Sequence, residues 1–391
     1  MLKNTTAIIG RLQCYNRYYT INTVAQKSPQ INTFIQPIIS LEDIDFKQKN
    51  GIRIFSGMQP TGDGLHLGNY LGAMSNWLKI QDLASLNTNN SVLFSIVDSH
   101  SLTATSTISP EKLRNNTINV AIQYLACGID PSKVILFNQS MVPAHSELLW
   151  ILNCITPFSK LTQMIQYKEK SKASQVVTNG LLSYPVLMAS DILLYKSTHV
   201  PVGEDQTQHL ELTRELVDRF HKQYCVNGKT DYFPIPKTVI SKLNKKIMSL
   251  NDGSVKMSKS NPQENSRINL SDSDKEIQSK IKKSKTDSIM GISYDPENRP
   301  DISNLLSILS SCTDRHIDDL VKEFHDKSNS VFKDYLSQSL IKKISPIREQ
   351  INYYQSNPKQ VQDILYQGAA SANAIANKNL KEIKDLVGLF N

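Results

Sequence analysis

FSGMQPTGDGLHLGNY, residues 55–70, is the stretch of sequence that decides the fold. It begins within a short β-prone run, IRIFSG, and passes through Gly57, Gly62, Gly64 and Gly68 into a predicted helix. Glycine lets a backbone approach a nucleotide closely, and the N–H groups at a helix start favour phosphate. Ligands of open α/β sheets bind at the carboxyl ends of strands. The stretch therefore predicts an α/β fold with a nucleotide site at this turn.

The turn alone does not establish a catalytic site, because glycine-rich turns between a strand and a helix are often only structural. Its glycine spacing matches neither the GxGxxG pattern of dinucleotide-binding proteins nor the Walker A pattern of P-loop enzymes. The spacing therefore argues against both of those classes.

Further β-prone runs follow along the chain, separated by segments of helical periodicity. SVLFSIVD at residues 91–98 and KVILFNQS at 133–140 are typical of buried strands, and HVPVG at 199–203 is similarly β-branched. Between the first two runs, Pro110 starts a helix that we predict to continue through Cys127. Strands that alternate with helices favour a parallel sheet with right-handed crossovers.

The chain is predicted to have three segments. We interpret residues 1–45 as a leader, residues 50–265 as a parallel-sheet catalytic domain, and residues 266–391 as an all-helical domain. The leader prediction rests on residues 1–41, which contain four basic residues and no Asp or Glu. This composition is typical of a mitochondrial transit peptide; the alternative is a disordered extension.

Overall composition excludes several classes of protein. The five cysteines form no CxxC pair, which indicates a reduced compartment and no structural zinc. No apolar run reaches the roughly 20 residues that a membrane-spanning helix needs, so we expect no membrane function.

A second chemical signal is KMSKS, residues 256–260. It lies in a stretch, residues 237–285, where 12 Lys and Arg residues outnumber 5 acidic ones, and which we predict to be an exposed loop region. Lys256 and Lys259 can both turn toward one polyphosphate and neutralise the charge on a leaving pyrophosphate. The alternative is a solvated basic loop without a ligand.

Together these motifs resemble the two signatures of the class I aminoacyl-tRNA synthetases, with HLGN at residues 66–69 similar to the first and KMSKS identical to the second. Within that class the chain resembles the tryptophanyl-tRNA synthetases. The segments that carry this closer resemblance are FSGMQPTG, LGNYLGA, VPAH, SYPVLMASDILLY, VPVGEDQTQHLELTRELVDRF and IMSL.

The resemblance implies a Rossmann-like catalytic domain, a helical tRNA (anticodon)-binding domain and a two-step reaction. ATP and L-tryptophan form tryptophanyl-adenylate and pyrophosphate, with Mg²⁺ expected to assist, and the amino acid then passes to tRNA(Trp). It also implies a homodimer. The leader composition indicates the mitochondrial matrix, and we expect no membrane or DNA partner. No resident metal ion is expected.

The resemblance assigns the family's functional roles to individual residues of this chain. Those expected to be catalytic are His66, Asn69, Lys256 and Lys259. Those expected around ATP are Gln59, Gly68, Asn69, Gly203, Glu204, Asp205, Ile247, Lys256, Met257, Ser258, Lys259 and Ser260. Those expected around tryptophan are Asp191, Tyr184, Met188, Phe55, Gly57, Val97, His100, Val202 and Gln206.

Asp191 is the residue that the resemblance assigns to amino-acid selection, as the acceptor for the indole N–H. A substrate that leaves such a buried acceptor unpaired is typically rejected by about 10⁴ to 10⁵. Tyr184 and Met188 share a helix face with Asp191, although from spacing alone they are ordinary core residues. Glu204 and Asp205 could likewise be helix caps, and His66 merely a cap at a helix start.

Lys168 and Lys170 match a family segment that reaches toward ATP, although alternating charges on a helix usually face solvent. Two positions depart from the family pattern. The loop between Gly62 and His66 is one residue longer than usual, and Asp301 stands where the family commonly has Gly. We expect the second departure to have only a local effect.

Three alternatives remain open on the sequence. A tyrosyl-tRNA synthetase shares the fold and both signatures, but it lacks the GEDQTQHLELTR context. A nucleotidyltransferase that makes an adenylated cofactor can share the first turn, but the basic stretch and the helical tail argue against it. A non-catalytic, synthetase-derived RNA-binding protein is disfavoured by the intact signatures.

Overall fold

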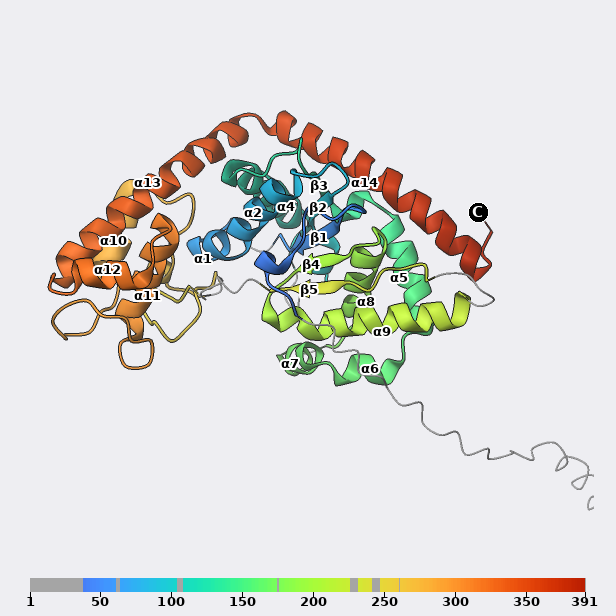
Figure 1. Ribbon diagram of the computed structural model, residues 1–391, viewed down its shortest axis with the longest axis horizontal. Coiled ribbons are helices and arrows are strands. Elements are labelled where there is room, and N and C mark those ends of the chain that lie inside the picture. The colour runs from blue at the N-terminus through green and yellow to red at the C-terminus, as the bar shows by residue number, and fades with distance from the viewer. Residues whose placement is uncertain are drawn as a thin grey trace, which may run out of the picture. The chain divides into compact units, whose positions relative to one another are not determined.

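The computed structural model describes residues 38–60, 64–103, 108–173, 176–225, 231–240, 247–259 and 261–390 (Figure 1). The predicted leader up to residue 37 lies outside these residues, as do residues 61–63 of the glycine-rich turn and Ser260. No helix within the described ranges is both long and apolar enough to cross a membrane.

A five-stranded parallel sheet forms the centre of the fold and confirms the predicted α/β class. Its strands are β1 (Arg53–Met58), β2 (Ser91–Ile96), β3 (Ile135–Asn138), β4 (His199–Pro201) and β5 (Lys237–Val239). They are ordered β3-β2-β1-β4-β5. The chain thus builds outward from β1 to β3 and then returns to the other side of β1. The carboxyl ends of β1 and β4 flank this reversal, which is where open α/β sheets bind ligands.

Helices connect the strands. The elements before β4 are η2 (Leu41–Asp43), α1 (Leu67–Asn69), the π-helical turn η3 (Tyr70–Met74), α2 (Ser75–Ala84), α3 (Asp98–Ser101), α4 (Pro110–Cys127), η4 (Gln139–Met141), α5 (Ala144–Ile155), α6 (Phe158–Gln163), α7 (Ile165–Ala173) and α8 (Asn179–Leu193). Those after β4 are η5 (Glu204–Gln206) and α9 (Thr207–Tyr224).

Helix α4 has the bounds that the sequence predicts, and its ends show why. The Ser109 side chain accepts a hydrogen bond from the Lys112 N–H, and Pro110 occupies the first helical position. Gly128 ends the helix in the left-handed conformation, with φ of 110°. Local residues at both ends therefore set the bounds of α4.

Strand alternation sends side chains to two hydrophobic clusters, one on each face of the sheet. Ile54 belongs to the first cluster, with residues of α2 and α4, whereas Phe55 belongs to the second, with residues of α5, α8 and α9. Consecutive residues of β1 therefore pack against different sets of helices.

The C-terminal part of the chain is helical, as predicted. Its elements are η6 (Glu264–Ser266), α10 (Asp274–Lys283), α11 (Pro300–Thr313), α12 (Ile317–Phe324), α13 (Asn329–Ser356) and α14 (Pro358–Val387). The stretch 237–285 is not one exposed loop, because it contains β5 and α10, whose Ile277 and Ile281 are fully buried. The hydrophobic spacing within α10 outweighs the high lysine content.

Hydrophobic packing divides the chain differently from the predicted boundary at 265/266. Helices α10 to α13 form a third cluster, and this cluster also contains Ile247, Leu250 and Met257 from the KMSKS segment. Conversely, α14 packs along β3 and contributes Leu365 to the first cluster and Ala376 to the second (Figure 1). Each segment packs where its apolar residues are buried, irrespective of its position in the sequence.

Residues 38–45, predicted to belong to the leader, are part of the folded core. Ile39 pairs with Val239 of β5, and its neighbours Leu41 and Ile44 are buried in the first cluster. The acid-free composition ends at residue 41, but the apolar residues around it pack on the sheet. Composition alone therefore placed the end of the leader, at residue 45, after residues that already pack on the sheet.

Candidate active site

His66 and Asn69 cap the helix that follows the glycine-rich turn. The His66 Nδ1 accepts a hydrogen bond from the Asn69 N–H at 3.3 Å, and the Asn69 Oδ1 accepts one from the His66 N–H at 3.2 Å. The cap interpretation of His66 is therefore correct. It does not exclude a chemical role, because the Nε2 atom remains available.

The surroundings of His66 determine the pKa of its imidazole. Burial, and then the nearby positive charges of Lys259 and Lys256, lower the pKa of His66 to about 4. The imidazole is therefore neutral at pH 7, and since Nδ1 accepts a hydrogen bond, Nε2 carries the proton. Both lysines of KMSKS thus act electrostatically on the first signature, although about 190 residues separate the two motifs in the sequence.

KMSKS begins on the second arm of a short hairpin, residues 247–257, which we call the KMSKS hairpin. The Ser249 N–H donates to the Val255 carbonyl at 2.8 Å, and the Met257 N–H donates to the Ile247 carbonyl at 3.0 Å. Ile247 and Met257 are buried in the third cluster, whereas Lys256 is exposed. The buried residues anchor the loop and leave the Lys256 side chain open to solvent.

The two signatures meet through backbone contacts. The Leu67 N–H donates to the Ile268 carbonyl at 2.8 Å, so the helix start pairs with the segment that follows KMSKS. A Cβ atom on Gly68 would lie 3.7 Å from the Ile247 Cβ and 3.0 Å from the His66 ring. Gly68, Ile247 and His66, all predicted site residues, are therefore adjacent.

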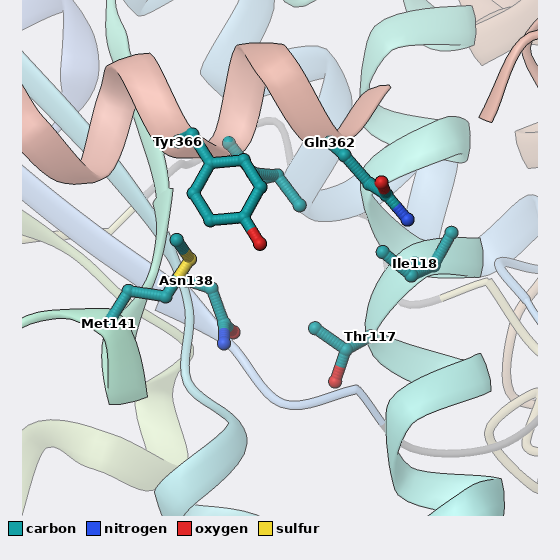
Figure 2. A pocket seen from close by; sticks show the side chains of 7 residues that line it. Thr117, Ile118, Asn138, Met141, Gln362 and Tyr366 are labelled. Atoms are coloured by element: carbon teal, nitrogen blue, oxygen red, sulfur yellow. The ribbon is translucent and has the colours of Figure 1, made fainter. Parts of the chain in front are cut away.

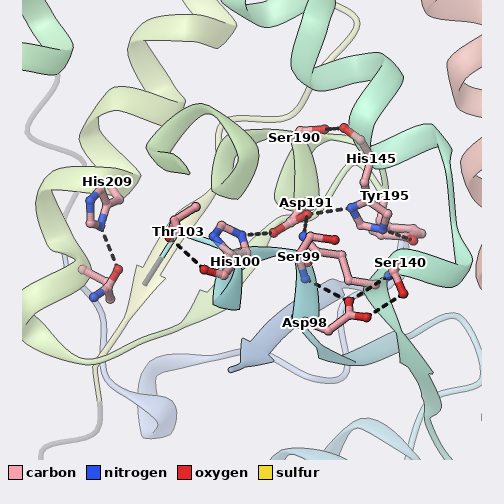
Figure 3. Close-up of polar contacts among 12 residues, drawn as sticks. Asp98, Ser99, His100, Thr103, Ser140, His145, Ser190, Asp191, Tyr195 and His209 are labelled. Carbon is pink, nitrogen blue, oxygen red and sulfur yellow. Dashed lines mark hydrogen bonds and ion pairs between the residues drawn. The ribbon is translucent and has the colours of Figure 1, made fainter. Parts of the chain in front are cut away.

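Asp191 lies at the centre of a buried polar network (Figure 3). Its Oδ1 accepts from the His145 Nδ1 and the Gln139 Nε2, each at 2.6 Å, and its Oδ2 lies 2.8 Å from the His100 Nε2. The Nε2 of His145 in turn lies 2.9 Å from the Tyr195 hydroxyl. Residues from α3, η4, α5 and α8 thus converge on one carboxylate.

The carboxylate of Asp191 is ionised although it is only 1% exposed. Burial alone raises its pKa, but the hydrogen bonds from His100 and His145 outweigh burial and hold the pKa below its ordinary value. Its Oδ2 has one donor in the network, and a carboxylate oxygen can accept two. Asp191 can therefore accept one more N–H group.

A second polar network joins α8 to the carboxyl end of β4. The Tyr184 hydroxyl lies 3.1 Å from the His209 Nε2, and the His209 Nδ1 lies 2.7 Å from the Gln206 Oε1. The Gln206 Nε2 donates to the Asp205 Oδ2 at 2.6 Å. Asp205 therefore bonds to side chains and does not cap α9. The network links residues predicted for tryptophan to one predicted for ATP.

The ends of β1 and β2 meet at Gly57 and Val97. A Cβ atom on Gly57 would lie 2.7 Å from the Val97 Cγ1, so no larger residue fits without displacing Val97. Gly57 and Gln59 are exposed at the carboxyl end of β1, and Phe55 is buried beneath them. Glycine is required here by close packing.

Four other predicted residues lie on α7, on α8 and after β4. Met188 is half-buried on α8 against the second cluster, and Val202 follows β4, where its N–H donates to the Val239 carbonyl at 3.1 Å. Lys168 is exposed on α7. Lys170 is also on the surface, but its ammonium lies 4.4 Å from the centre of the Tyr184 ring. Lys170 is thus directed at the site, unlike a solvent-facing charge.

A cavity of about 190 Å³ lies elsewhere, between α4, β3 and α14 (Figure 2). Thr117, Asn138, Gln362 and Tyr366 provide its polar lining, and none of its lining residues was predicted as a site residue. Within the described residues, no three His, Cys, Asp or Glu side chains are grouped so that they could hold a metal ion. The polar networks around His66 and Asp191 therefore define the candidate site.

Comparison with known proteins agrees with this geometry. Residues 47–344 match the family described as tRNA synthetases class I (W and Y). The chain belongs to this family. The mitochondrial tryptophan–tRNA ligase of Dictyostelium discoideum is 61% identical over 380 residues, covering 90% of this chain and 100% of the relative. The tryptophan–tRNA ligase of Caldanaerobacter subterraneus is 46% identical, covering 86% and 98%.

Among solved structures, the tryptophanyl-tRNA synthetase of Campylobacter jejuni, in complex with ADP and tryptophan, has a TM-score of 0.73. It is 31% identical and covers 86% of this chain and 100% of its own. In this class I synthetase the two signatures are adjacent, since Leu67 pairs with Ile268 and Gly68 lies next to Ile247.

Three members of the Asp191 network in this synthetase were not predicted from the sequence. Gln139 falls within the predicted strand 133–140, whereas β3 ends at Asn138, and His145 and Tyr195 were recognised only as parts of VPAH and SYPVLMASDILLY. The signal that could have identified Gln139 is a polar residue at the end of a buried strand, because such a residue lies at the carboxyl edge of the sheet, where ligands bind.

Proposed function

We propose that the chain is a tryptophan–tRNA ligase of mitochondria. The observation that carries this proposal is the ionised, buried Asp191, in a chain whose two nucleotide signatures are close enough for Lys256 and Lys259 to lower the pKa of His66. An anionic acceptor with one free hydrogen-bonding position suits the indole N–H, which is a donor only. The tryptophan–tRNA ligases among the relatives support the same substrate.

The first step is attack by a carboxylate oxygen of tryptophan on the α-phosphorus of ATP. A new P–O bond forms, the bond to the bridging oxygen of the β-phosphate breaks, and pyrophosphate leaves with that electron pair. Lys256 and Lys259 would neutralise the charge that develops on the leaving group. Neutral His66 would donate its Nε2–H to the α-phosphate. Positioning and charge stabilisation dominate such a reaction.

The second step transfers the aminoacyl group to tRNA(Trp). A ribose hydroxyl at the tRNA terminus, the 2′-hydroxyl in class I enzymes by resemblance, attacks the carbonyl carbon of the adenylate. An ester bond forms, the C–O bond to phosphate breaks, and AMP leaves with that electron pair while the hydroxyl proton passes to its phosphate or to water. Basic residues of α10, including Lys275, Lys282 and Lys283, provide surface charge for the tRNA backbone.

Mg²⁺ is expected to enter as the complex with ATP. The described residues offer no group of three or more carboxylate, thiol or imidazole side chains for the ion. Mg²⁺ is usually held by substrate phosphates, water and few protein ligands, so binding together with ATP needs no such group of side chains. When bound, it would withdraw charge from the phosphates. We assign no side chain to it.

A homodimer is supported by the exposed apolar residues of three successive helices. Trp150 of α5, Phe158 of α6 and Ile165 of α7 are 70%, 68% and 60% exposed. Large apolar side chains that solvent reaches are candidates for burial by a partner. A second copy of the chain is the partner that the family resemblance indicates.

Localisation to the mitochondrial matrix is part of the same proposal and rests on the leader composition and on the mitochondrial relative.

The direct test is ATP–pyrophosphate exchange with each of the 20 amino acids. Tryptophan should stimulate exchange, and tyrosine and phenylalanine should not. Exchange that depends on tyrosine and not on tryptophan would overturn the proposal in favour of a tyrosyl-tRNA synthetase. Tryptophan binding without any exchange or aminoacylation would favour the non-catalytic RNA-binding alternative.

Lys259→Ala tests the mechanism. Because Lys259 is proposed to act on charge that exists only in the transition state, the substitution should slow adenylate formation far more than it weakens tryptophan binding. Single-turnover adenylate formation and equilibrium binding of tryptophan measure the two effects. Equal losses in both would contradict this role.

A further inference from the structure

Helix α11 holds the KMSKS hairpin from the side through two polar residues, Asp301 and Asn304. They are three positions apart on one helix, so they lie on the same face. Both contact backbone atoms of the hairpin and not its lysine side chains. These contacts are not explained by the packing of α11 in the third cluster, which uses Ile302, Leu305 and Leu306.

Asp301 binds the tip of the hairpin. Its Oδ1 accepts a hydrogen bond from the Gly253 N–H at 2.7 Å, and its Oδ2 lies 3.2 Å from the Lys285 Nζ. The Asp301 side chain is only 11% exposed, whereas that of Lys285 is 60% exposed. The hydrogen bond to Gly253 is therefore shielded from water and the ion pair is not, so the hydrogen bond is the stronger anchor.

The backbone at the hairpin tip packs directly on the start of α11. A Cβ atom on Gly253 would lie 2.4 Å from the Pro300 carbonyl carbon and 2.6 Å from the Asp301 nitrogen. Only glycine allows this approach without displacement of the backbone. The first turn of a helix also favours a negative charge, which stabilises Asp301 at this position.

Asn304 binds the first arm of the hairpin. Its Oδ1 accepts from the Met248 N–H at 2.9 Å, and its Nδ2 donates to the Met248 carbonyl at 3.0 Å and to the Ser249 carbonyl at 3.3 Å. Asn304 is buried, so all three contacts are protected from solvent. Together the two residues fix the tip and the first arm to the same helix face.

We propose that Asp301 and Asn304 are positioning residues. By fixing the hairpin to α11, they determine where Lys256 and Lys259 lie relative to the proposed phosphate site. This inference rests on the proposed function of the two lysines. Lys256 directly follows Val255, whose carbonyl pairs with Ser249, and it forms an antiparallel bridge with Met248, the residue that Asn304 holds. A shift of the hairpin on α11 would therefore shift Lys256.

Under this proposal Asp301 affects the reaction through the position of the KMSKS hairpin, which goes beyond the local effect that the sequence leads us to expect. Position 301, where the sequence departs from the family pattern, supplies an anchor for the KMSKS hairpin. A glycine at this position would have no side chain to accept the Gly253 hydrogen bond. The hairpin would then be held to this face of α11 by Asn304.

The test compares Asp301→Ala, Asp301→Asn and Lys285→Ala in the full-length chain. Asp301→Ala removes the acceptor for Gly253 and should slow single-turnover adenylate formation about tenfold. The Kd for tryptophan should stay within about twofold, because Asp191 lies in a different network. Asp301→Asn keeps an acceptor oxygen and should restore most of the rate. Lys285→Ala, which removes only the exposed ion pair, should behave as wild type.

A matched control separates positioning from stability. Asp318 also lies in the first turn of a helix, α12, and is exposed, so Asp318→Ala should leave both rate and binding unchanged. Thermal unfolding of each variant reports any structural loss. A rate for Asp301→Ala equal to wild type, or an equal loss of rate and tryptophan affinity, would overturn the positioning role.

These outcomes are distinct from failure of the proposed function. If wild type shows no tryptophan-dependent exchange, the function itself is wrong. If wild type is active and Lys259→Ala slows adenylate formation, the function stands, and the Asp301 variants then decide the positioning role alone.

Discussion

Replacement of Asp191 by Asn is the sharpest test of amino-acid selection. In wild type, two carboxylate oxygens face three donors, from His100, His145 and Gln139, at 2.6 to 2.8 Å. Asparagine has a single acceptor oxygen and an NH₂ group of the same size. At least one of the three donors would therefore face another donor inside the protein.

The cost for tryptophan follows from the loss of the proposed hydrogen bond from the indole N–H to the charged carboxylate, which is about 1.5–3 kcal/mol. Since about 1.4 kcal/mol corresponds to a factor of ten, kcat/KM for tryptophan should fall roughly 10- to 150-fold. The fall should appear in the KM for tryptophan and not in the KM for ATP, because Asp191 and the signature motifs lie in separate networks.

Steady-state pyrophosphate exchange at varied tryptophan and varied ATP measures both constants. Asp98→Asn is a matched control, because Asp98 accepts from the Ser140 hydroxyl at 2.5 Å and from the Asn138 Nδ2 at 2.8 Å and makes no contact with Asp191 in the network of Figure 3. It should lower stability without changing the KM for tryptophan. An Asp191→Asn variant with kcat/KM within about threefold of wild type would refute the selection role.

Three further predictions concern stability. Burial lowers the pKa of His209 to about 4, below the unfolded value of 6.5, so the unfolded chain binds more protons between these values and stability falls as pH drops from 6.5 toward 4. His66 and His199 have similarly lowered pKa values, so His209→Gln should reduce the slope of the urea-unfolding free energy over this range without abolishing it, and the exposed His325→Gln should leave the slope unchanged. Gly368→Ala would place a Cβ atom 1.8 Å from the Leu136 carbonyl oxygen, and thermal unfolding should reveal a loss of at least about 2 kcal/mol unless α14 moves without cost. Deletion of residues 1–45 removes the buried Leu41 and Ile44 and should cost about 3 kcal/mol more in chemical denaturation than deletion of residues 1–37; equal stability would place both residues outside the core.

The sequence by itself determined the α/β class, the strand-to-helix turn and the bounds of α4. These features depend on local patterns, since Ser109, Pro110 and Gly128 set the ends of a helix wherever the helix packs. The two signature motifs also came from the sequence, because their residue types carry the chemistry of phosphate binding. Selection of tryptophan came from resemblance, since no local pattern shows what a buried carboxylate faces.

Only the tertiary structure decided which residues surround that carboxylate and what holds the signatures together. Gln139 and His145 reach Asp191 across 52 and 46 residues, and Asp301 reaches Gly253 across 48. Hydrogen bonds at such separations depend on how the sheet orders its strands and where each helix packs. The glycine-rich turn 55–70 therefore predicted a nucleotide site, but the order of the strands and the packing of the KMSKS hairpin on α11 decide where Lys256 and Lys259 lie relative to that turn.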